Sequence, residues 1–277
     1  GDLLDEGSGS LNALELHEAL ARIGAQLDTE VGSDATMLEL TTLERHAEQG
    51  VTLLADMALR PRFEQRDFDR VRDLRLNRLI QLRDMPSALA DRVFAELLFK
   101  THPYGHLPIG TEGALRAMTL RDVTGFHERI YGPSAVTIVA IGDASHGRLR
   151  ELVDRAFSDW VSAKPPPDPP ADPLAAHPVP GGPARLAVVN RAAAPQSELR
   201  IGHVGPPRST PDYHALLVLN MVLGGQFVSR INLNLREKKG YTYGARTSFD
   251  FRRAPGPFTL QASVQSEATA DAVREAI

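Results

Sequence analysis

Residues 224–244 read GGQFVSRINLNLREKKGYTYG, and this is the stretch of sequence that decides the fold. Its opening glycine pair interrupts the chain, and an amphipathic helix is expected to follow. Val228, Ile231 and Leu235 recur at helical spacing, with Leu233 beside them. They are therefore expected to form the apolar side of that helix.

The helix is expected to end in basic residues and to lead directly into a strand. Lys238–Lys239 lie where the helix dipole favours cations, and Gly240 is a residue on which helices commonly end. Tyr243 then belongs to an alternating strand. Arg236 and Tyr243 can therefore lie near each other across the turn, where their donors suit a backbone carbonyl or a carboxylate. The alternative is an ordinary helix end whose charges are solvated.

Composition places the chain among globular proteins. Its 277 residues are 42% hydrophobic and 24% charged, which allows one large domain or two of moderate size. The 31 basic and 35 acidic residues give a net charge of -4, so no overall positive field would recruit nucleic acid. The absence of cysteine excludes disulfides and thiolate metal ligands. No apolar run reaches membrane-spanning length, so no membrane span is expected.

Periodicity along the chain predicts a mixture of helices and strands without a strict βαβ repeat, which is typical of an α+β fold. Helices are expected at residues 10–23, 44–59, 63–82, 86–99, 119–130, 145–160 and 211–223, and from about residue 268. Strands are expected at residues 27–31, 37–43, 136–141, 185–190, 198–204 and 258–264, and up to residue 251.

A proline-rich segment at residues 164–184 divides the chain. It contains KPPPDPP at 164–170, which is incompatible with the interior of a helix or a sheet and is typical of an extended spacer. The segment therefore predicts a first domain at residues 1–163 and a second at residues 185–277.

Metal binding and nucleophilic catalysis find little support in the residues themselves. His102 and His106 are four residues apart, but Pro103 and Gly105 keep them off a regular helix, so they do not form a helical zinc pair. The chain has no cysteine nucleophile and no Gly-x-Ser-x-Gly elbow after a strand. No phosphate-binding Gly-x-x-x-x-Gly-Lys-Ser/Thr loop occurs either.

The helix expected at residues 63–82 is rich in arginine but also carries several acidic residues. Such a mixture is typical of a solvated, ion-paired helix face rather than of a nucleic-acid surface. No nucleic-acid partner is therefore expected.

Several motifs together resemble the pitrilysin/insulinase family of zinc metallopeptidases. The resemblance extends from near residue 1 to residue 277. The motifs are LLDEG at 3–7 before a helix, HPYG at 102–105 followed by Gly110, Thr119, Asp122, Tyr131, Pro133 and Gly142-Asp143, and LREKKG at 235–240 with Tyr243.

The resemblance implies two related α+β domains, each a mostly antiparallel sheet packed against helices. In this family, one half or subunit binds zinc through His-x-x-Glu-His and a distant glutamate. The other half carries an arginine and a tyrosine seven residues apart that bind substrate, and Arg236 and Tyr243 match that pair. Gly224 and Gly225 are candidate substrate-binding residues beside it. The family pattern also implies that the chain is truncated at both ends.

The zinc motif of the family is not matched. Alignment of Gly7 with the glycine that follows the family's zinc helix places Asp2 at the second histidine and Gly1 at the glutamate. The region of the third ligand offers Asn77 and Arg78. Zinc in proteins is held by cysteine, histidine and carboxylate ligands, so this set is unsuitable.

The chain is therefore interpreted as the non-catalytic, substrate-binding subunit or half of a zinc endopeptidase. Arg236 and Tyr243 would bind the backbone of a peptide substrate, or the oxyanion derived from it, in a site shared with a homologous catalytic chain or fused half. Zinc is expected in that partner, and no cofactor is expected on this chain. The alternative is a structural or assembly subunit with the same fold and no role in peptide hydrolysis.

Overall fold

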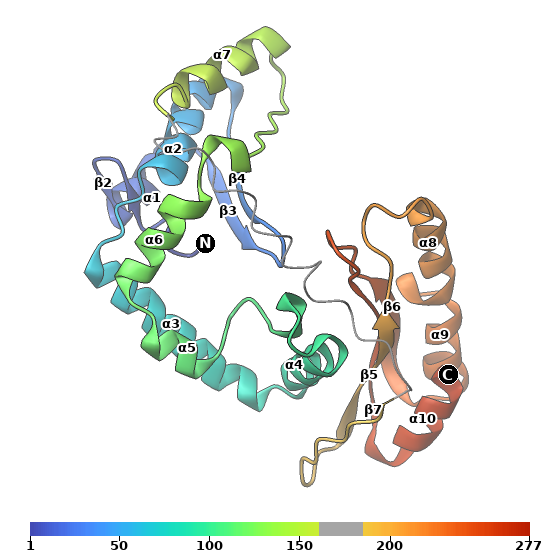
Figure 1. The fold of residues 1–277 in the computed structure, drawn as a ribbon. Helices are drawn as coiled ribbons and strands as arrows, with labels where there is room; N and C mark the ends of the chain where they lie inside the picture. Colours follow the sequence, from blue (N-terminus) through green and yellow to red (C-terminus); the bar gives the residue numbers. More distant parts are fainter. Residues whose placement is uncertain (161–184) are drawn as a thin grey trace. The chain divides into compact units, whose positions relative to one another are not determined.

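A computed structural model describes residues 1–160 and 185–277, which form two compact units (Figure 1). The first unit combines Gly1–Leu79 with the chain from Pro108 onward, and the second combines Ile80–Leu107 with the residues that follow position 184. The units are therefore not consecutive in sequence. The proline-rich segment 164–184 lies outside the described residues, so the division at that segment stays a prediction.

The first unit contains an antiparallel hairpin, formed by β3 (Gln26–Val31) and β4 (Thr36–Thr41), as the alternating sequence predicts. A shorter pair joins β1 (Gly7–Ser8) to β2 (Leu11–Asn12). The remaining elements are helices α1 (Ala13–Arg22), α2 (Ala47–Leu59), α3 (Gln65–Asp84, whose last residues belong to the second unit), α5 (Glu112–Ala117), α6 (Leu120–Ile130) and α7 (His146–Ala156), with 3-10 turns at Glu44–His46 and Pro133–Ala135.

Helix α1 provides the centre of the first unit's core. Its buried residues Leu16 and Leu20 pack with Leu53 and Met57 of α2. The helix begins after Asn12 rather than at the predicted residue 10. The Asn12 side chain accepts a hydrogen bond from the Glu15 amide at 3.0 Å, and the Glu15 carboxylate accepts one from the Asn12 amide at 2.8 Å. This reciprocal capping box fixes the start of the helix two residues later.

The second unit is a three-stranded antiparallel sheet with helices, so the predicted α+β class is confirmed. The strand order is β5 (Gln196–Val204), β7 (Pro257–Gln265), β6 (Thr242–Phe249). The helical elements are α4 (Pro86–Phe99), α8 (Tyr213–Asn220), α9 (Arg230–Asn232) and α10 (Thr269–Ala276), with π-helical turns η4 (Met221–Gly225) and η5 (Leu233–Lys238) and 3-10 turns at Pro103–Gly105 and Ser266–Ala268.

One face of this sheet is apolar and forms the core of the second unit. Leu199, Leu260 and Val264 of the sheet are buried with Ile231 and Leu235 of the α9–η5 segment. Because side chains alternate along a strand, the intervening residues form a polar face on the other side. Helix α4 packs against that polar face beside β5.

Two expected strands are not formed. Among the described residues, segments 136–141 and 185–190 belong to no helix or sheet, and their apolar side chains are exposed, with Ile141 at 92% and Leu186 at 87%. A strand requires a hydrogen-bonded neighbour. Within residues 1–160 and 185–277, neither segment has one.

The helical stretch Tyr213–Lys238 is long and apolar enough to cross a bilayer by length and composition, although the sequence was expected to contain no such segment. Its apolar residues also serve the fold, because Ile231 and Leu235 belong to the core of the second unit. The backbone at Gln226 is extended, with φ -144° and ψ 168°, so the stretch is interrupted in the middle.

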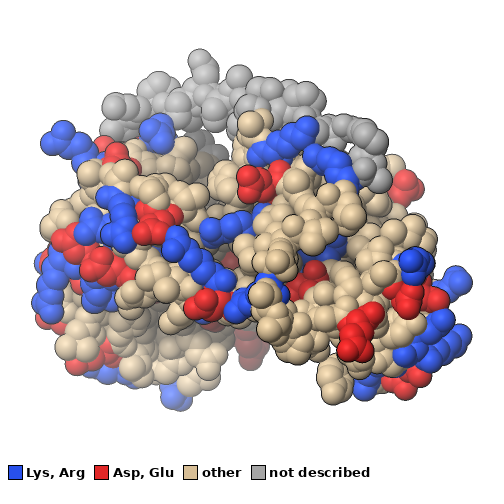
Figure 2. Space-filling view, turned by 90° about the horizontal axis from the view of Figure 1, so that it is seen from below, with Lys and Arg blue, Asp and Glu red and all other residues tan. Residues whose placement is uncertain are grey.

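Charged residues of both signs are interspersed over the face drawn in Figure 2. The arginines of α3 follow the same pattern: Arg70 pairs with Glu6, Arg72 with Asp69 and Arg75 with Asp2. These contacts agree with the ion-paired helix face that the sequence predicts.

Candidate functional site

The segment after the glycine pair does form a helix, but a shorter one than expected. Gln226–Ser229 separates η4 from α9, and Ser229 has the extended backbone of a cap residue. Ile231 and Leu235 are buried as predicted. Val228 precedes the helix and is 62% exposed, so its assignment to the apolar stripe was wrong. The helix then continues in π conformation through Arg236, a backbone form often found at functional sites.

Gly240 ends the helical segment as the sequence predicts. Its φ of +66° is left-handed, which a glycine adopts without steric cost. The Gly240 amide donates to the Arg236 carbonyl at 3.1 Å, and the Tyr241 amide donates to the Leu235 carbonyl at 3.0 Å. The chain therefore reverses sharply and enters β6 within two residues. Lys239 forms an ion pair with Glu275 of α10 at 2.8 Å, which ties the turn to that helix.

Arg236 lies against an aromatic ring with part of its guanidinium unpaired. Its Cζ atom is 4.3 Å from the centre of the Phe227 ring, and its Nε atom is 3.6 Å from the Glu237 carboxylate. Its Nη1 atom is buried and has no hydrogen-bond partner among the described residues. A buried donor without a partner is costly. The ring holds this arginine in place, and its side chain as a whole is 31% exposed.

Tyr243 projects from an irregularity at the start of β6. The β6–β7 register shifts between Thr242 and Ala245, which marks a bulge. The Thr242 hydroxyl lies 2.9 Å from the Gly244 carbonyl and 2.7 Å from the Ser263 carbonyl, and accepts from the Gly244 amide at 3.1 Å. A bulge re-aims the side chain beside it. Tyr243 is 89% exposed.

The structure places Arg236 and Tyr243 at opposite ends of the same helix-to-strand turn. Within the part of the chain that the structure describes, no hydrogen bond or ring contact joins the two side chains. Arg236 therefore lies on the Phe227 ring, and Tyr243 extends separately into solvent.

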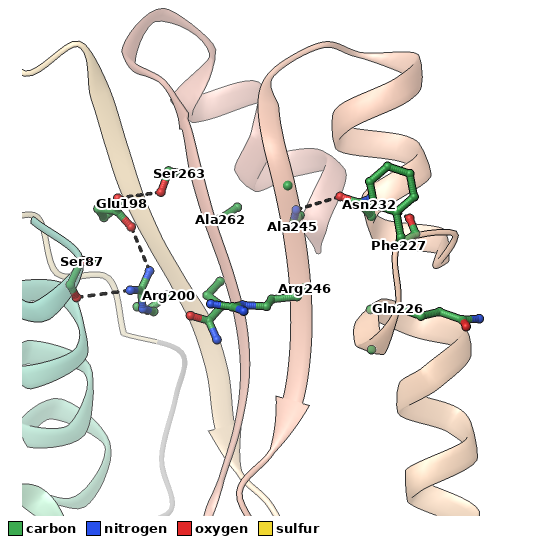
Figure 3. A pocket seen from close by; sticks show the side chains of 14 residues that line it. Ser87, Glu198, Arg200, Gln226, Phe227, Asn232, Ala245, Arg246, Ala262 and Ser263 are labelled. Carbon is green, nitrogen blue, oxygen red and sulfur yellow. Dashed lines mark hydrogen bonds and ion pairs between the residues drawn. The ribbon is translucent and has the colours of Figure 1, made fainter.

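Asn232 links the two sides of the site, and sequence reasoning missed it. Its amide nitrogen donates to the Phe227 carbonyl at 2.7 Å, and its side-chain oxygen accepts from the Ala245 amide at 3.0 Å (Figure 3). The side chain is buried. One amide thus fixes the loop that carries the Phe227 ring to the strand just after the Tyr243 bulge. A polar residue between the apolar Ile231 and Leu233 was the one available signal.

Gly224 and Gly225 lie where a helix end closely approaches β6. A Cβ atom at Gly224 would lie 2.5 Å from the Thr247 amide nitrogen, and one at Gly225 would lie 2.9 Å from the Asn220 side-chain nitrogen. The Thr247 hydroxyl also donates to the Asn220 side chain at 2.8 Å. Both glycines are required for this packing, and both line the cavity described next.

A cavity of about 460 Å³ lies within the second unit. Gly224–Phe227 form one side, the polar face of the sheet forms another, and Ser87 of α4 contributes at the far end (Figure 3). Phe227, which carries Arg236 on its ring, therefore also lines the cavity.

The residues where the family resemblance places zinc do not fit that metal. Both oxygens of the Asp2 carboxylate accept hydrogen bonds from Arg75, at 2.6 and 2.8 Å. These bonds hold the pKa of Asp2 below its ordinary value. Arg75 thus occupies both oxygens of the Asp2 carboxylate, which a metal ion would need as ligands. No group of three or more potential metal ligands occurs among the described residues.

The predicted histidine loop is packed into the second unit rather than arranged around a metal. His102 is buried beside the rings of Phe99 and Tyr104, at 5.6 and 4.7 Å between centroids. Its Nδ1 atom accepts a hydrogen bond from the Tyr104 amide at 3.1 Å. The Tyr104 hydroxyl in turn accepts from the Ala254 amide at 3.2 Å. These contacts anchor the loop to residues far along the chain.

Comparisons with known proteins agree with the motifs. A family model described as Peptidase M16 inactive domain matches residues 117–277, and one described as Insulinase (Peptidase family M16) matches residues 3–111. The chain is 30% identical to an uncharacterized zinc protease of Mycobacterium tuberculosis, over 98% of this chain and 61% of that relative. It therefore spans about three fifths of the relative's length.

Two solved structures are similar over 99% of this chain. The peptidase M16 inactive domain from Pseudomonas fluorescens gives a TM-score of 0.81 at 26% identity, with 66% of that chain covered. A protease from Helicobacter pylori gives a TM-score of 0.89 at 22% identity, with 67% covered. The second likeness concerns the fold alone.

Proposed function

Because this chain belongs to peptidase family M16, we propose that it is the non-catalytic, substrate-binding subunit or half of a zinc endopeptidase. In this proposal Arg236 and Tyr243 bind a peptide substrate in a site shared with a homologous catalytic chain or a fused half. The metal belongs to that partner, and this chain supplies no zinc ligand.

The observation that carries the proposal is the state of Arg236. Its side chain is 31% exposed, and Phe227 holds the guanidinium from the side. A guanidinium held in this way donates a charge-assisted hydrogen bond to a substrate oxygen that reaches its exposed part. If that oxygen acquires negative charge during hydrolysis, the bond joins two opposite charges and strengthens.

Tyr243 would supply a second donor from the other side of the same turn. Its hydroxyl lies on an exposed side chain at a bulge, so it can extend toward a substrate held by another chain. Asn232 positions both residues by joining the Phe227 loop to β6. The Asn232 side chain would thus hold the Arg236 and Tyr243 donors in place before the substrate binds.

The test is reconstitution with the partner that carries His-x-x-Glu-His. The mixture is expected to cleave peptides, and kcat/KM is expected to fall roughly 100-fold or more in Arg236→Ala and in Tyr243→Phe. Arg230→Ala and Tyr241→Phe are the matched controls, because they remove the same groups from neighbouring positions. Metal analysis of the isolated chain is expected to find no stoichiometric zinc.

Unchanged activity in both site variants would refute the role of Arg236 and Tyr243 and would leave the structural or assembly subunit as the explanation. Stoichiometric zinc in the isolated chain would refute the assignment of the metal to the partner.

A further inference from the structure

The cavity in the second unit is floored by a row of polar side chains that crosses the sheet. Gln261 of the central strand β7 is the register partner of both Arg200 on β5 and Arg246 on β6. Residues in register across a sheet project from the same face. All three line the cavity.

The Arg200 guanidinium is buried and hydrogen-bonded to neighbouring residues of the second unit. Its side chain is only 6% exposed and donates to the Ser87 carbonyl at 3.2 Å, to Asp91 at 2.5 Å and to Glu198 at 3.2 Å. Glu198 also accepts from the Ser263 hydroxyl at 2.6 Å. Asp91 and Glu198 therefore share the single positive charge of Arg200, and both are hydrogen-bonded.

Arg246 also lines the cavity, but its guanidinium has no partner among the described residues. Its side chain is exposed and extends from β6 across the sheet into the space beside Arg200 (Figure 3). Among the residues that the structure describes, it forms no ion pair or hydrogen bond through its guanidinium, whereas Arg200 forms several. A guanidinium presents paired donors that match a carboxylate.

We propose that this cavity binds a carboxylate of the peptide substrate, with Arg246 as the residue that recognises it. The inference rests on the proposed function and names a substrate class, namely peptides with an acidic group. Phe227 connects the two sites, since it lines the cavity and also holds Arg236. A peptide whose backbone binds Arg236 can therefore place a neighbouring side chain in the cavity. Its volume of about 460 Å³ accommodates an acidic side chain together with water.

The experiment measures binding to the whole chain by fluorescence anisotropy. The probes are labelled, C-terminally amidated octapeptides that carry a single Glu, Gln or Lys, moved through every position. A second set lacks acidic side chains and has either a free or an amidated C-terminus. These sets distinguish a side-chain carboxylate from a terminal one.

At one position, the Glu peptide is expected to bind about fivefold to tenfold more tightly than its Gln counterpart. Arg246→Gln should abolish this preference, and Arg246→Glu should reverse it toward the Lys peptide. Arg230→Gln is the matched control, because it removes the same charge outside the cavity, and it should retain the preference. A preference confined to the free C-terminus would assign the cavity to the terminal carboxylate.

A wild-type chain without any carboxylate preference, or an Arg246→Gln variant that retains it, would overturn the inference. The proposed function fails in a different way. If Arg236→Ala weakens binding of all peptides alike while no carboxylate preference exists, only the assignment of Arg246 fails. If the preference depends on Arg246 while Arg236→Ala leaves binding and reconstituted cleavage unchanged, only the proposed function fails. Absence of binding by every peptide would overturn the cavity assignment as well.

Discussion

At Gly224, the neighbouring strand β6 leaves no room for a side chain. Replacement by alanine is expected to reduce the free energy of unfolding by about 1–3 kcal/mol, because the new methyl group would collide with the backbone and hydroxyl of Thr247. Gly244→Ala is the matched control, since its Cβ would meet only the Asn232 side-chain oxygen at 3.9 Å. Urea unfolding of both variants measures the difference, and equal stabilities would contradict the packing described for η4.

At this scale, the sequence names candidate side chains but not the contacts that position them. Arg236 and Tyr243 are predicted from spacing and from the family motif, and their role stays a proposal. Asn232 is not predicted, because its acceptor and donor contacts lie 13 residues ahead at Ala245 and five residues back at Phe227. A local pattern contains no information about such contacts.

Helix α6 gives a prediction at the scale of the element. His127 donates from Nε2 to the Ala58 carbonyl of α2 at 2.9 Å and stacks on Tyr131, with 4.7 Å between the ring centroids. Burial lowers the pKa of His127 below its ordinary value. The folded state therefore binds this proton less readily than the unfolded state does. The contribution to stability is complete above a pH of about 6.5 and is lost as the pH falls below it.

The expected result is a larger loss of stability for the wild type than for His127→Gln when the pH is lowered from about 8 to about 5.5. Glutamine keeps an amide donor for Ala58 but does not titrate in this range. Denaturant unfolding at each pH provides the comparison. Parallel pH profiles for the two proteins would show that His127 does not contribute to the pH dependence.

The element predictions were most accurate where the periodic pattern and its end signals agreed. The helix predicted at residues 119–130 begins at a capping box of Thr119 and Asp122, and the left-handed Gly240 ends its helical segment as expected. The π conformation of residues 233–238 could not be foreseen, because six residues are too few to distinguish the wider spacing of a π turn from that of an α turn. Residues 136–141 have the composition of a strand, but pairing depends on a neighbour that composition does not reveal.

The second unit brings together parts of the chain that are distant in sequence. Arg200 on β5 bonds to Ser87 and Asp91 of α4, more than 100 residues earlier. The second unit groups Ile80–Leu107 with the residues after position 184, although these segments are far apart in the sequence. Long-range partners of this kind have no local signature, so the composition of the unit could not be predicted from the sequence.

Arg200→Met is therefore expected to loosen α4 from the sheet. The variant should lose about 2–4 kcal/mol of unfolding free energy, because Glu198 and Asp91 lose their shared cation. Hydrogen exchange of the α4 amides should accelerate more than exchange in α6. Arg274→Met is the control, since the Arg274–Asp271 pair is exposed. Unchanged exchange in α4 would show that its contact with the sheet does not depend on Arg200.

The two apolar segments, residues 136–141 and 185–190, also bear on how the isolated chain behaves in solution. Among residues 1–160 and 185–277, the backbone groups of these segments form no sheet hydrogen bonds, and their apolar side chains are exposed, so each segment is a template for pairing with another copy. Such pairing requires no unfolding. We therefore expect self-association to increase with protein concentration at temperatures well below the melting temperature. The highest concentration at which the chain stays monomeric would then be set by its native surface and not by its thermal stability.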